Sequence, residues 1–458
     1  MPTEIRRYVR ALGLDAYVVG GAVRDELLGI QHADEDFLVL GVTHEDLRAA
    51  LARYGRVEEM EVHGQLVGVR LHPRDRAVAR LAPAGIELTP PRRERSTGPG
   101  HGDFEIVVDP DVGIEEDMRR RDFTVNAMAR SLATGALVDP FGGLADLGRR
   151  ELRTVSQRSF VEDPLRLLRG LRLVSQLGLT PSGETLAQMR VAARGLEHVS
   201  SERIGGGVAA DGMGELSKLL MGREPDRALR LARETGVLTV VIPEFGAAIG
   251  YSLGSRRQPL PLDEHLFSVV RALAERDAPL EVRLAALLHD LGKPATDASG
   301  GDHAAEGAEL AGRILARLRY PTATQREVGQ LVRAHAFGVE LWLGPDDGGR
   351  ATRRFLLSHG LQRARWLVLH KEADLATKHV PDAERRALAR LGVEIEHQAS
   401  APHRVADLAV DGSDLLAVGY GEGPVVGRTL AALLDAVVDD PSLNERETLL
   451  ARAEELRP

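Results

Sequence analysis

The stretch Tyr17–Leu40, YVVGGAVRDELLGIQHADEDFLVL, decides the fold of the chain. Its first residues, Tyr17–Val19, predict a short buried strand, and Ala22–Leu28 predict a helix that begins just beyond it. Between them, Gly20 and Gly21 let backbone N–H groups approach an anion at the helix N-terminus. This junction can bind a phosphate group, although a plain glycine turn between a strand and a helix is the alternative.

Two carboxylates stand in the second half of the stretch. Asp34 and Asp36 are separated by one residue and lead into the apolar run Phe37–Leu40. If that run is a strand, both side chains project from the same face near one end, because side chains alternate along a strand. Such a pair can hold a divalent metal ion, and the alternative is two solvated acids at the strand mouth. Together with the glycine junction, the pair favours a site for a metal-bound nucleotide.

The sequence GGAVRD, followed by DED and an apolar strand, resembles the signature of the class II tRNA nucleotidyltransferases and bacterial poly(A) polymerases. These enzymes add nucleotides to RNA 3′ ends without a nucleic-acid template. The resemblance implies catalysis and Mg²⁺ binding by Asp34 and Asp36, and phosphate binding by Gly20, Gly21 and Arg24. It also implies an α+β fold: a polymerase-beta-like nucleotidyltransferase head with a mixed sheet and helices, an all-helical neck, an HD domain and a C-terminal helical region.

Length and composition bound the possibilities. At 458 residues the chain has room for three or four domains of roughly 100–200 residues each. It contains no cysteine, which excludes disulfides and zinc–thiolate sites. No stretch approaches the roughly 20 apolar residues of a membrane span, and the N-terminus MPTEIRRYVR lacks a signal-peptide core. We therefore expect a cytoplasmic enzyme without a membrane partner. The net charge of −9 argues against bulk electrostatic coating of nucleic acid, but clustered arginines leave local basic surfaces possible.

Residues 1–150 read as an α/β head. His44–Tyr54 has the periodicity of an amphipathic helix, and Leu66–Leu71 and Ile86–Thr89 alternate as strands do. Glu87 could bring a third carboxylate onto the sheet face that carries the two aspartates and so join the metal site, or it could be an edge-strand acid facing water. Pro90–Gly102, rich in Pro, Gly and Arg, predicts a mobile loop whose arginines could meet phosphate.

The segment Arg119–Met128, RRRDFTVNAM, predicts a second contact with the nucleotide. In a helix, Asp122 and Asn126 would lie four residues apart on one face, offering an acceptor for a ribose hydroxyl. The alternative is a helix N-terminus capped by the aspartate. The segment is similar to the RRDFTxNA motif of the family, which implies that Arg121, Asp122 and Asn126 contact the nucleotide.

From residue 151 to 255 the pattern is helical and predicts the neck. In VEDPLRLLRGLR, Asp163 precedes a proline and predicts a helix start, while Arg166 and Arg169 follow along one side. Taken alone these residues are a helix cap and a basic stripe. Their resemblance to the family's EDxxR motif implies that Asp163 and Arg166 read the Watson–Crick edge of the incoming base, and we include Arg169 in the nucleotide site. The Gly-rich segment 205–214 departs from the family pattern and predicts an interruption of the helix.

Residues 256–380 contain a second constellation, in the segments DEHLF, ALLHDLGKP, GDHAAEG, VRAHAF and HKEADLA. Each histidine alone could be an ordinary core or surface residue. The ordered set resembles the HD metal-phosphohydrolases, which implies a divalent transition metal bound by His265, His289, Asp290 and Asp374. A second site would be completed by His303 and His335, with Lys293 on phosphate. Residues 381–458 predict a C-terminal helical body, and the similarity of this region to a C-terminal segment of the family implies that it packs against the body and contacts tRNA.

These patterns predict template-independent addition of C and A to the 3′ end of tRNA from CTP and ATP, by two-metal nucleotidyl transfer, with an HD phosphohydrolase activity. Poly(A), CC-only or A-only addition shares all the motifs and stays open. Two further rivals are an HD phosphohydrolase whose head binds nucleotide or RNA without catalysis, and a non-catalytic tRNA scaffold.

Overall fold

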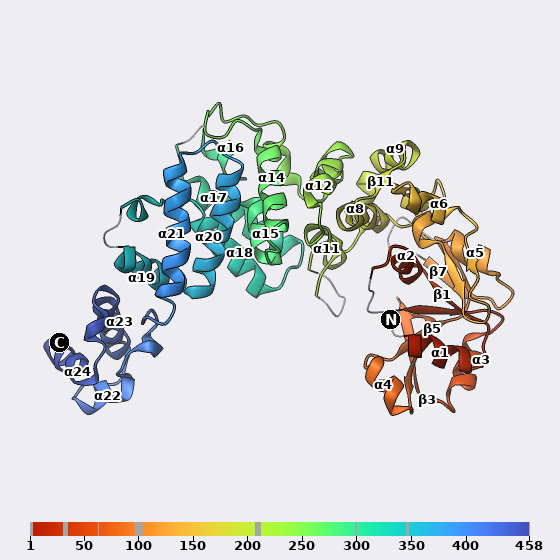
Figure 1. Ribbon diagram of the computed structural model, residues 1–458, viewed down its shortest axis with the longest axis horizontal. Helices are drawn as coiled ribbons and strands as arrows, with labels where there is room; N and C mark the ends of the chain where they lie inside the picture. The colour runs from red at the N-terminus through yellow and green to blue at the C-terminus, as the bar shows by residue number, and fades with distance from the viewer. Residues whose placement is uncertain are drawn as a thin grey trace. The chain divides into compact units, whose positions relative to one another are not determined.

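The N-terminal part of the chain folds around a mixed sheet. The computed structural model describes residues 3–30, 35–62, 64–96, 104–206, 212–297, 300–344 and 348–457. Packing divides the chain into two units, Met1–Pro243 with Arg317–Tyr320, and Glu244–Ala316 with Pro321–Pro458. Figure 1 shows the first unit mostly in red to yellow and the second in green to blue.

Over the described residues, the sheet of the first unit has seven strands in the order β3-β4-β5-β2-β1-β8-β9. The central strand β2 pairs antiparallel with β1 and parallel with β5, so the sheet is mixed, as predicted. The strands are β1 (Ala16–Val19), β2 (Asp36–Val39), β3 (Gly55–Val62), β4 (Gln65–Pro73), β5 (Ile86–Thr89), β8 (Ala129–Ser131) and β9 (Leu137–Val138).

Apolar residues of the central strands form the core of the head. Phe37, Leu38 and Val39 of β2 and Leu88 of β5 are all buried, which is why this short run becomes a central strand. Asp36 begins β2 at the exposed end, so the apolar run aims the carboxylate out of the core. The helices of the head are α1 (Thr3–Ala11), α2 (Gly21–Leu27), α3 (His44–Leu51), α4 (Arg76–Leu81), α5 (Ile114–Arg119) and α6 (Gly143–Gly148).

The predicted loop Pro90–Gly102 is partly wrong. Arg92–Ser96 is a strand, β6, which pairs antiparallel with β7 (Phe104–Val108). The β-branched and aromatic residues of β7 favour an extended strand, and its backbone pairs with that of the arginine-rich segment. Residues 97–102 lie outside the described part of the chain.

The helix predicted over Arg119–Met128 is also wrong. Helix α5 ends at Arg119, and the following residues form an extended bend and a 3-10 turn, η1 (Thr124–Asn126). Phe123 is extended because its side chain is buried and its backbone bridges to Thr154 of the neighbouring segment. The predicted meeting of Asp122 and Asn126 nevertheless occurs, because the tight turn brings the two side chains together.

The rest of the first unit is helical, with one small parallel pair of strands, β10 (Glu151–Leu152) and β11 (Thr180–Pro181). Helix α8 packs against both α11 and α12 and is its longest helix over the described residues. The helices are α7 (Ser159–Glu162), α8 (Leu165–Leu177), α9 (Gly183–Ala192), η2 (Ala193–His198), α10 (Ser201–Ile204), α11 (Glu215–Leu220), α12 (Pro225–Glu234) and α13 (Val237–Val241). The described ends of segment 205–214 are non-helical, as predicted; residues 207–211 lie outside the described ranges.

The second unit begins with a helical bundle. Helices α14, α15, α18 and α20 contact one another, and α14 and α15 are almost entirely buried, because their apolar residues extend around the helix. Figure 1 shows these helices in green and blue beside α21. The elements are η3 (Pro243–Ala248), α14 (Leu262–Ala274), α15 (Leu280–Leu288), α16 (Lys293–Thr296), α17 (His303–Arg317), α18 (Thr322–Ala334), η4 (Glu340–Trp342), α19 (Gly348–His359), α20 (Leu361–Ala376) and α21 (Asp382–His397).

The C-terminal segment of the second unit has its own small core. Leu415, Leu433, Val437 and Leu449 are buried together in it, and α19 of the bundle packs against its longest helix, α23. Its elements are η5 (Val405–Asp407), α22 (Gly412–Ala417), α23 (Pro424–Asp439), η6 (Pro441–Leu443) and α24 (Arg446–Glu455). The C-terminal region is therefore helical, as predicted.

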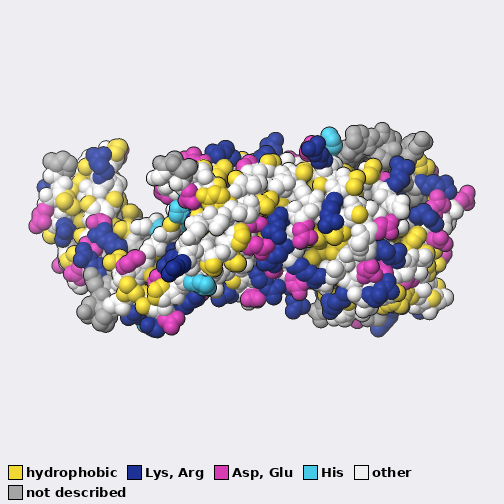
Figure 2. Space-filling model, turned by 90° about the horizontal axis from the view of Figure 1, so that it is seen from above, with side chains coloured by type: hydrophobic (Ala, Val, Ile, Leu, Met, Phe, Trp, Pro, Cys, Tyr) yellow, Lys and Arg dark blue, Asp and Glu magenta, His cyan; other side chains and the backbone are white. Residues whose placement is uncertain are grey.

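Two surface properties bear on the class of protein. None of the helices within the described ranges has both the length and the apolar character needed to cross a membrane. On the face seen in Figure 2, Lys and Arg side chains lie among acidic ones. Local basic clusters must therefore account for any attraction of nucleic acid to this face.

Candidate functional site

The glycine junction of the head depends on a backbone conformation that favours glycine. Gly20 precedes α2 with a φ of 73°. A Cβ atom at Gly20 would lie 2.7 Å from Nη1 of Arg121, closer than real Cβ atoms come to a neighbour. Gly20 therefore supplies both the turn and the space in which Arg121 reaches the junction.

A chain of hydrogen bonds runs from the junction to the neck. Arg24 Nη1 donates to Asn126 Oδ1 at 2.5 Å, and Asn126 Nδ2 donates to Asp122 Oδ1 at 2.9 Å. Arg169 of α8 donates through Nε to Asp122 Oδ2 at 2.8 Å. Four of the predicted nucleotide residues, which are up to 145 positions apart in sequence (169 − 24), are thus joined directly.

The Asp122–Arg169 pair is charged at neutral pH. Burial acts to raise the pKa of Asp122, but the positive charge of Arg169 and the hydrogen bonds from Asn126 and Arg169 outweigh it and hold the pKa below its ordinary value. In turn, the Asp122 carboxylate raises the pKa of Arg169. The pair therefore fixes Asn126 from one side and α8 from the other.

The base-reading pair predicted in the neck lies at the start of α8. Asp163 Oδ1 accepts from the backbone N–H of Leu165 at 3.0 Å, as predicted for a residue at a helix start. Arg166 is buried, with Nη1 donating to Ser159 Oγ at 3.1 Å and Nη2 to Arg120 O at 2.8 Å. Its Nε lies 3.9 Å from Asp163 Oδ2, so a fixed guanidinium faces the carboxylate.

Two described carboxylates stand together on the sheet. Asp36 of β2 is the register partner of Glu87 in the parallel strand β5, so both side chains leave the same face. Glu87 is half-exposed and accepts from Arg70 Nη2 at 2.5 Å. The neighbouring positions agree with the idea of a third carboxylate, while Arg70 balances the charge of Glu87. Asp34 lies outside the described residues.

One cavity collects the described candidates of the head. Its volume is about 520 Å³, within the range of small-molecule sites. The predicted residues that line it are Gly20, Gly21, Arg24, Asp36, Glu87, Arg121, Asp122, Asn126, Asp163, Arg166 and Arg169. Arg92, from the segment whose arginines were expected to meet phosphate, also lines it, as do Arg120 and Arg172, which were not predicted for the site. Arg172 continues the three-residue spacing of the α8 stripe, and this spacing was the signal that pointed to it.

The predicted HD residues come from five segments and meet in the helical bundle of the second unit. His265 lies on α14, His289 and His335 end α15 and α18, and His303 begins α17. Asp374 faces them from α20. The side chains of His265, His289, Asp290 and Asp374 are buried almost completely.

The distances divide these residues into two groups that share Asp290. In the first, Asp290 Oδ2 lies 3.2 Å from His289 Nε2 and 3.7 Å from His265 Nε2. His265 Nε2 is also 3.2 Å from Asp374 Oδ1. In the second, Asp290 Oδ1 lies 3.3 Å from His335 Nε2 and 3.6 Å from His303 Nε2. His265, His289 and Asp290 form one set of ligand atoms within 4.8 Å of one another, and Asp290, His303 and His335 form another, so each set could hold a metal ion and Asp290 belongs to both.

The hydrogen bonding of these groups fits a metal. Within the described ranges, His265 Nε2, His289 Nε2 and Asp290 Oδ1 are buried without a hydrogen-bond partner. The opposite ring nitrogens of two histidines form hydrogen bonds with backbone carbonyl groups. His289 Nδ1 lies 2.9 Å from Ala286 O, and His335 Nδ1 lies 2.6 Å from Val332 O. Such bonds fix the tautomer with Nε2 as the ligand atom. The orphaned atoms are therefore those that a cation would bind.

The protonation states of the centre also suit a metal. Burial lowers the pKa of His289 to about 4, so the imidazole is neutral at physiological pH and its lone pair is available. Burial raises the pKa of Asp290, but His289, His335 and Lys293 outweigh it, and the pKa lies well below its ordinary value. Neutral imidazoles facing ionised carboxylates are the ligand forms that bind metal.

Basic side chains surround the mouth of this centre. A cavity of about 380 Å³ is lined by Asp290, Asp374 and the cations Arg257, Lys293, Lys371 and Lys378. Lys293 Nζ lies 2.6 Å from Asp290 Oδ2, and Lys378 Nζ lies 2.7 Å from Asp374 Oδ1. These ammonium groups could turn to a phosphate once a metal neutralised the carboxylates.

Sequence reasoning missed His370. It is 2% exposed, and its ring contacts those of His289 and His335. Burial, with the neighbouring His289 and His335, holds its pKa well below the ordinary value. The available signal was its position four residues before Asp374, since two ligands on one helix face are often four residues apart.

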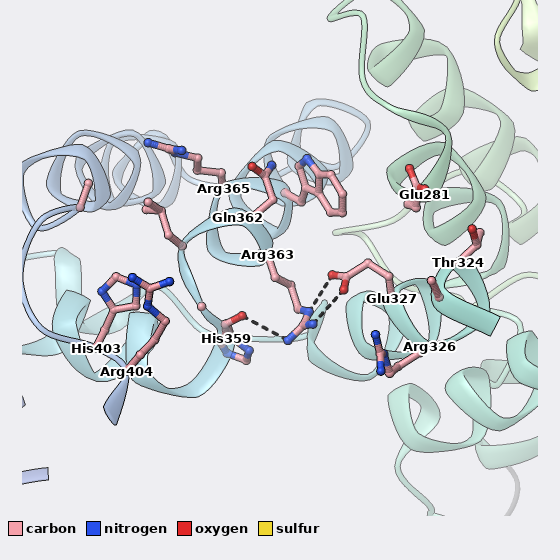
Figure 3. Close-up of a pocket in the computed structure, with 15 residues that line it drawn as sticks. Glu281, Thr324, Arg326, Glu327, His359, Gln362, Arg363, Arg365, His403 and Arg404 are labelled. Carbon is pink, nitrogen blue, oxygen red and sulfur yellow. Dashed lines mark hydrogen bonds and ion pairs between the residues drawn. The ribbon is translucent and has the colours of Figure 1, made fainter. Parts of the chain in front are cut away.

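A third cavity, of about 640 Å³, lies in the second unit away from the HD residues. Figure 3 shows Arg363 directed at Glu327, and Nε and Nη2 of Arg363 donate to the carboxylate at 2.7 and 2.8 Å. Arg326 also lines the cavity and pairs with no other residue in the described ranges. Arg365 and Arg404 also line it, and each is paired with a carboxylate, Arg365 with that of Glu396 and Arg404 with that of Asp407.

Three family models match successive parts of the chain. The model described as "Poly A polymerase head domain" matches residues 16–153. "Probable RNA and SrmB- binding site of polymerase A" matches residues 178–249, and "HD domain" matches residues 262–357. The head and HD matches cover the two groups of candidate residues described above, and both kinds of domain depend on metal ions.

A solved structure shares the fold over nearly its whole length. The chain resembles the Bacillus stearothermophilus CCA-adding enzyme in complex with CTP, with a TM-score of 0.70, 28% identity, and coverage of 99% of this chain and 96% of that one. The Thermotoga maritima CCA-adding enzyme complexed with tRNA has the same fold, with a TM-score of 0.58 at 20% identity, covering 100% and 96% of the two chains.

Curated relatives agree with these matches. The multifunctional CCA protein of Azoarcus sp. (strain BH72) is 37% identical over 327 residues, which cover 70% of this chain and 73% of the relative. The protein of the same name from Pseudomonas aeruginosa is 37% identical over 329 residues, covering 70% and 73%. With a nucleotidyltransferase head and an HD domain in one chain, the protein belongs to the family of the multifunctional CCA proteins.

Proposed function

We propose that the chain adds C and A nucleotides to the 3′ end of tRNA, using CTP and ATP, and that its HD domain is a metal-dependent phosphohydrolase. The observation that carries the first activity is the cavity of about 520 Å³ in which the described candidates of the head meet. The names of the relatives favour CCA over poly(A), CC-only or A-only addition. We place this nucleotide addition in the cytoplasm, because its proposed substrate, tRNA, is found there.

Each part of the head cavity suits one part of a nucleotide. The α2 N-terminus with Gly20 and Gly21, together with Arg24, would bind the phosphates. Asp122 orients Asn126 at the sugar, and Asp163 with Arg166 would read the base edge by offering an acceptor beside a fixed donor fork.

Asp36 and Asp34 would hold Mg²⁺, with Glu87 as a third carboxylate. The bound ion would supply Lewis-acid stabilisation of the triphosphate and lower the pKa of the RNA 3′-hydroxyl. The carboxylates would hold that ion against the α-phosphate while the arginines of the cavity balance the charge of the leaving pyrophosphate.

For the HD domain we propose a divalent transition metal held by His265, His289, Asp290 and Asp374, and a second held by His303 and His335 with Asp290. Imidazole-rich sets favour such metals over Mg²⁺. Phosphate esters at RNA ends, including 2′,3′-cyclic phosphates, are the proposed substrates, because the cationic mouth with Lys293 attracts phosphate.

The test of nucleotide addition uses tRNA transcripts that end before CCA, after C and after CC. CTP and ATP are supplied singly and together, and the 3′ ends are sequenced. Addition of CCA followed by a stop supports the proposal. Runaway or partial addition would move the product to poly(A), CC or A. No incorporation at any Mg²⁺ concentration would refute nucleotidyl transfer.

Single substitutions test whether nucleotide addition and phosphate-ester hydrolysis take place at separate sites. Asp36→Ala should abolish addition and leave hydrolysis of a 2′,3′-cyclic phosphate, whereas His289→Ala should abolish hydrolysis and leave addition. Loss of both activities in either variant would contradict two independent sites. Hydrolysis without addition in the unmodified protein would favour a non-catalytic head.

A further inference from the structure

His370 is a buried polar residue that the proposed HD centre does not yet use. Within the described ranges, neither Nδ1 nor Nε2 has a hydrogen-bond partner, although the residue is only 2% exposed. An imidazole that forms no hydrogen bond in a protein core costs free energy, because both nitrogens lose their water. A partner absent from the polypeptide, such as a cation, would remove this cost.

The ring lies where a further ligand would lie. Its centroid is 4.9 Å from that of His289, with the planes at 84°. His265 and His289, which are proposed as ligands of one ion, stand in a similar relation, with ring centroids 5.5 Å apart and planes at 71°. Rings bound to one ion through nitrogens about 2.0–2.1 Å away are expected at roughly this separation.

The spacing along α20 gives a second, independent reason. His370 and Asp374 are four residues apart in one helix, so their side chains lie on the same face. Pairs of ligands at this spacing hold metal ions in helices because both can reach one ion from successive turns. Asp374 is already directed at the centre, with Oδ1 3.8 Å from His289 Nε2.

We propose that His370 is a further nitrogen ligand of the HD centre, completing the metal position shared by His289 and Asp374 on its buried side. This inference rests on the metal centre proposed above. The additional imidazole makes that position richer in nitrogen. It therefore shifts the preference of the centre further toward Co²⁺, Ni²⁺ or Zn²⁺ and away from Mg²⁺.

The test is Co²⁺ binding to the full-length protein. The unmodified protein, His370→Leu and a control, His403→Leu, are titrated with Co²⁺ and followed by calorimetry and visible absorption. His403 is also a buried histidine, but it lines the third cavity instead of the HD centre. We expect His370→Leu to lower Co²⁺ affinity at least tenfold and to change the absorption spectrum, and His403→Leu to change neither.

Proton NMR of the Co²⁺ protein counts the imidazoles directly. An imidazole bound to Co²⁺ gives a hyperfine-shifted, exchangeable N–H signal. One such signal should vanish in His370→Leu and persist in His403→Leu. If His370 only packs in the core, His370→Leu should keep all the shifted N–H signals and an unchanged affinity for Co²⁺. That result would overturn the inference.

Two further outcomes are distinguishable. If the unmodified protein binds no Co²⁺, both the proposed centre and the role of His370 fail. If the unmodified protein binds Co²⁺ and His370→Leu binds it equally well, the proposed centre stands and the inference about His370 alone fails. Thermal unfolding of the metal-free proteins checks the fold. His370→Gln, which keeps a polar side chain, carries the same test should the leucine variant not fold.

Discussion

Gly20 meets two separate requirements, a positive φ and the space that Arg121 occupies. Another glycine of the chain meets only the first of these. Gly13 has nearly the same positive φ, 74°, but a Cβ there would meet no atom within 4 Å among the described residues. Alanine at either position should cost about 1–2 kcal/mol, because L residues resist this conformation. Only at Gly20 would the methyl group also displace Arg121.

Gly20→Ala should therefore lower kcat/KM for CTP incorporation at least tenfold, whereas Gly13→Ala should leave it within twofold. Steady-state incorporation into a tRNA transcript that ends before CCA measures both. Equal losses in the two variants would mean that backbone strain, and not the space for Arg121, explains the effect.

The buried Asp122 predicts a dependence of stability on pH. Its folded pKa lies below the ordinary value of about 3.9. The stabilisation by its charge is therefore complete above that value and is lost as pH falls toward the folded pKa. Asp122→Asn should be less stable than the unmodified protein by about 1–3 kcal/mol at pH 7, and the difference should shrink below pH ~4.

Urea unfolding followed by far-ultraviolet circular dichroism at a series of pH values measures this difference. Asp111→Asn is a suitable control, since Asp111 is exposed at the surface of the same unit. A gap between Asp122→Asn and the unmodified protein that stays constant as pH falls through 4 would contradict the assignment.

At the scale of elements, the approach of α8 to the 3-10 turn η1 shapes the head cavity. Gly170 of α8 faces Phe123, and a Cβ there would lie 2.8 Å from Cζ of the ring. Phe123 stands between Asp122 and the turn that carries Asn126. A side chain at position 170 would push these elements apart.

Gly170→Ala should consequently reduce nucleotide addition and raise the KM for CTP several-fold, because the residues on both sides of the cavity would separate. Gly312→Ala in α17 is the control: its Cβ meets nothing within 4 Å in the described structure. That change should stabilise the protein by about 0.5–1 kcal/mol and leave addition unaltered. Unchanged CTP kinetics in Gly170→Ala would show that the fit between α8 and the turn is not needed.

The helices and strands also show which parts of the fold could be predicted from the sequence. Strong local patterns were sufficient for β2, α2, α3 and β5, because each combines apolar periodicity with a clear start or end. The segment after Arg119 was predicted as a helix because its residues, taken locally, allow one. Burial of Phe123 against the neck decided otherwise, and that contact joins positions distant in sequence.

Much of the candidate site was predictable for a different reason. Motif resemblance identified residues such as Asp163 and His265 without knowledge of where they meet, and the described members of each set do meet. His370 could not be recognised in the same way. Its spacing of four residues from Asp374 was a weak signal, and it gains weight only when the fold places its ring against His289 and leaves its nitrogens without partners among the described residues.

At the scale of the whole molecule, the net charge of −9 makes tRNA binding depend on local arginine clusters. Arg326, Arg365 and Arg404 line the third cavity in the second unit, and Arg326 is the one of these three without a carboxylate partner among the described residues. Each neutralised phosphate contributes a slope of about −0.7 to −0.9 in the logarithm of affinity against the logarithm of salt concentration.

We therefore expect the Kd for tRNA to rise steeply with salt, and Arg326→Glu to weaken binding and flatten the slope. Glu422→Arg, at an exposed position of the same unit outside that cavity, is the reverse-charge control. Filter binding or fluorescence anisotropy over a fourfold range of salt measures both. A Kd unchanged across that range would exclude backbone contacts as the source of affinity.

The line of hydrogen bonds from Arg24 through Asn126 and Asp122 to Arg169 has a last consequence. It ties the proposed phosphate end of the cavity to the helix that begins beside the proposed base-reading pair. The hydrogen bonds thus hold the two ends at a set distance, and we expect the cavity to favour ligands of matching length. In the proposed site, a nucleotide can satisfy both ends only if its base and its phosphates are spaced to match.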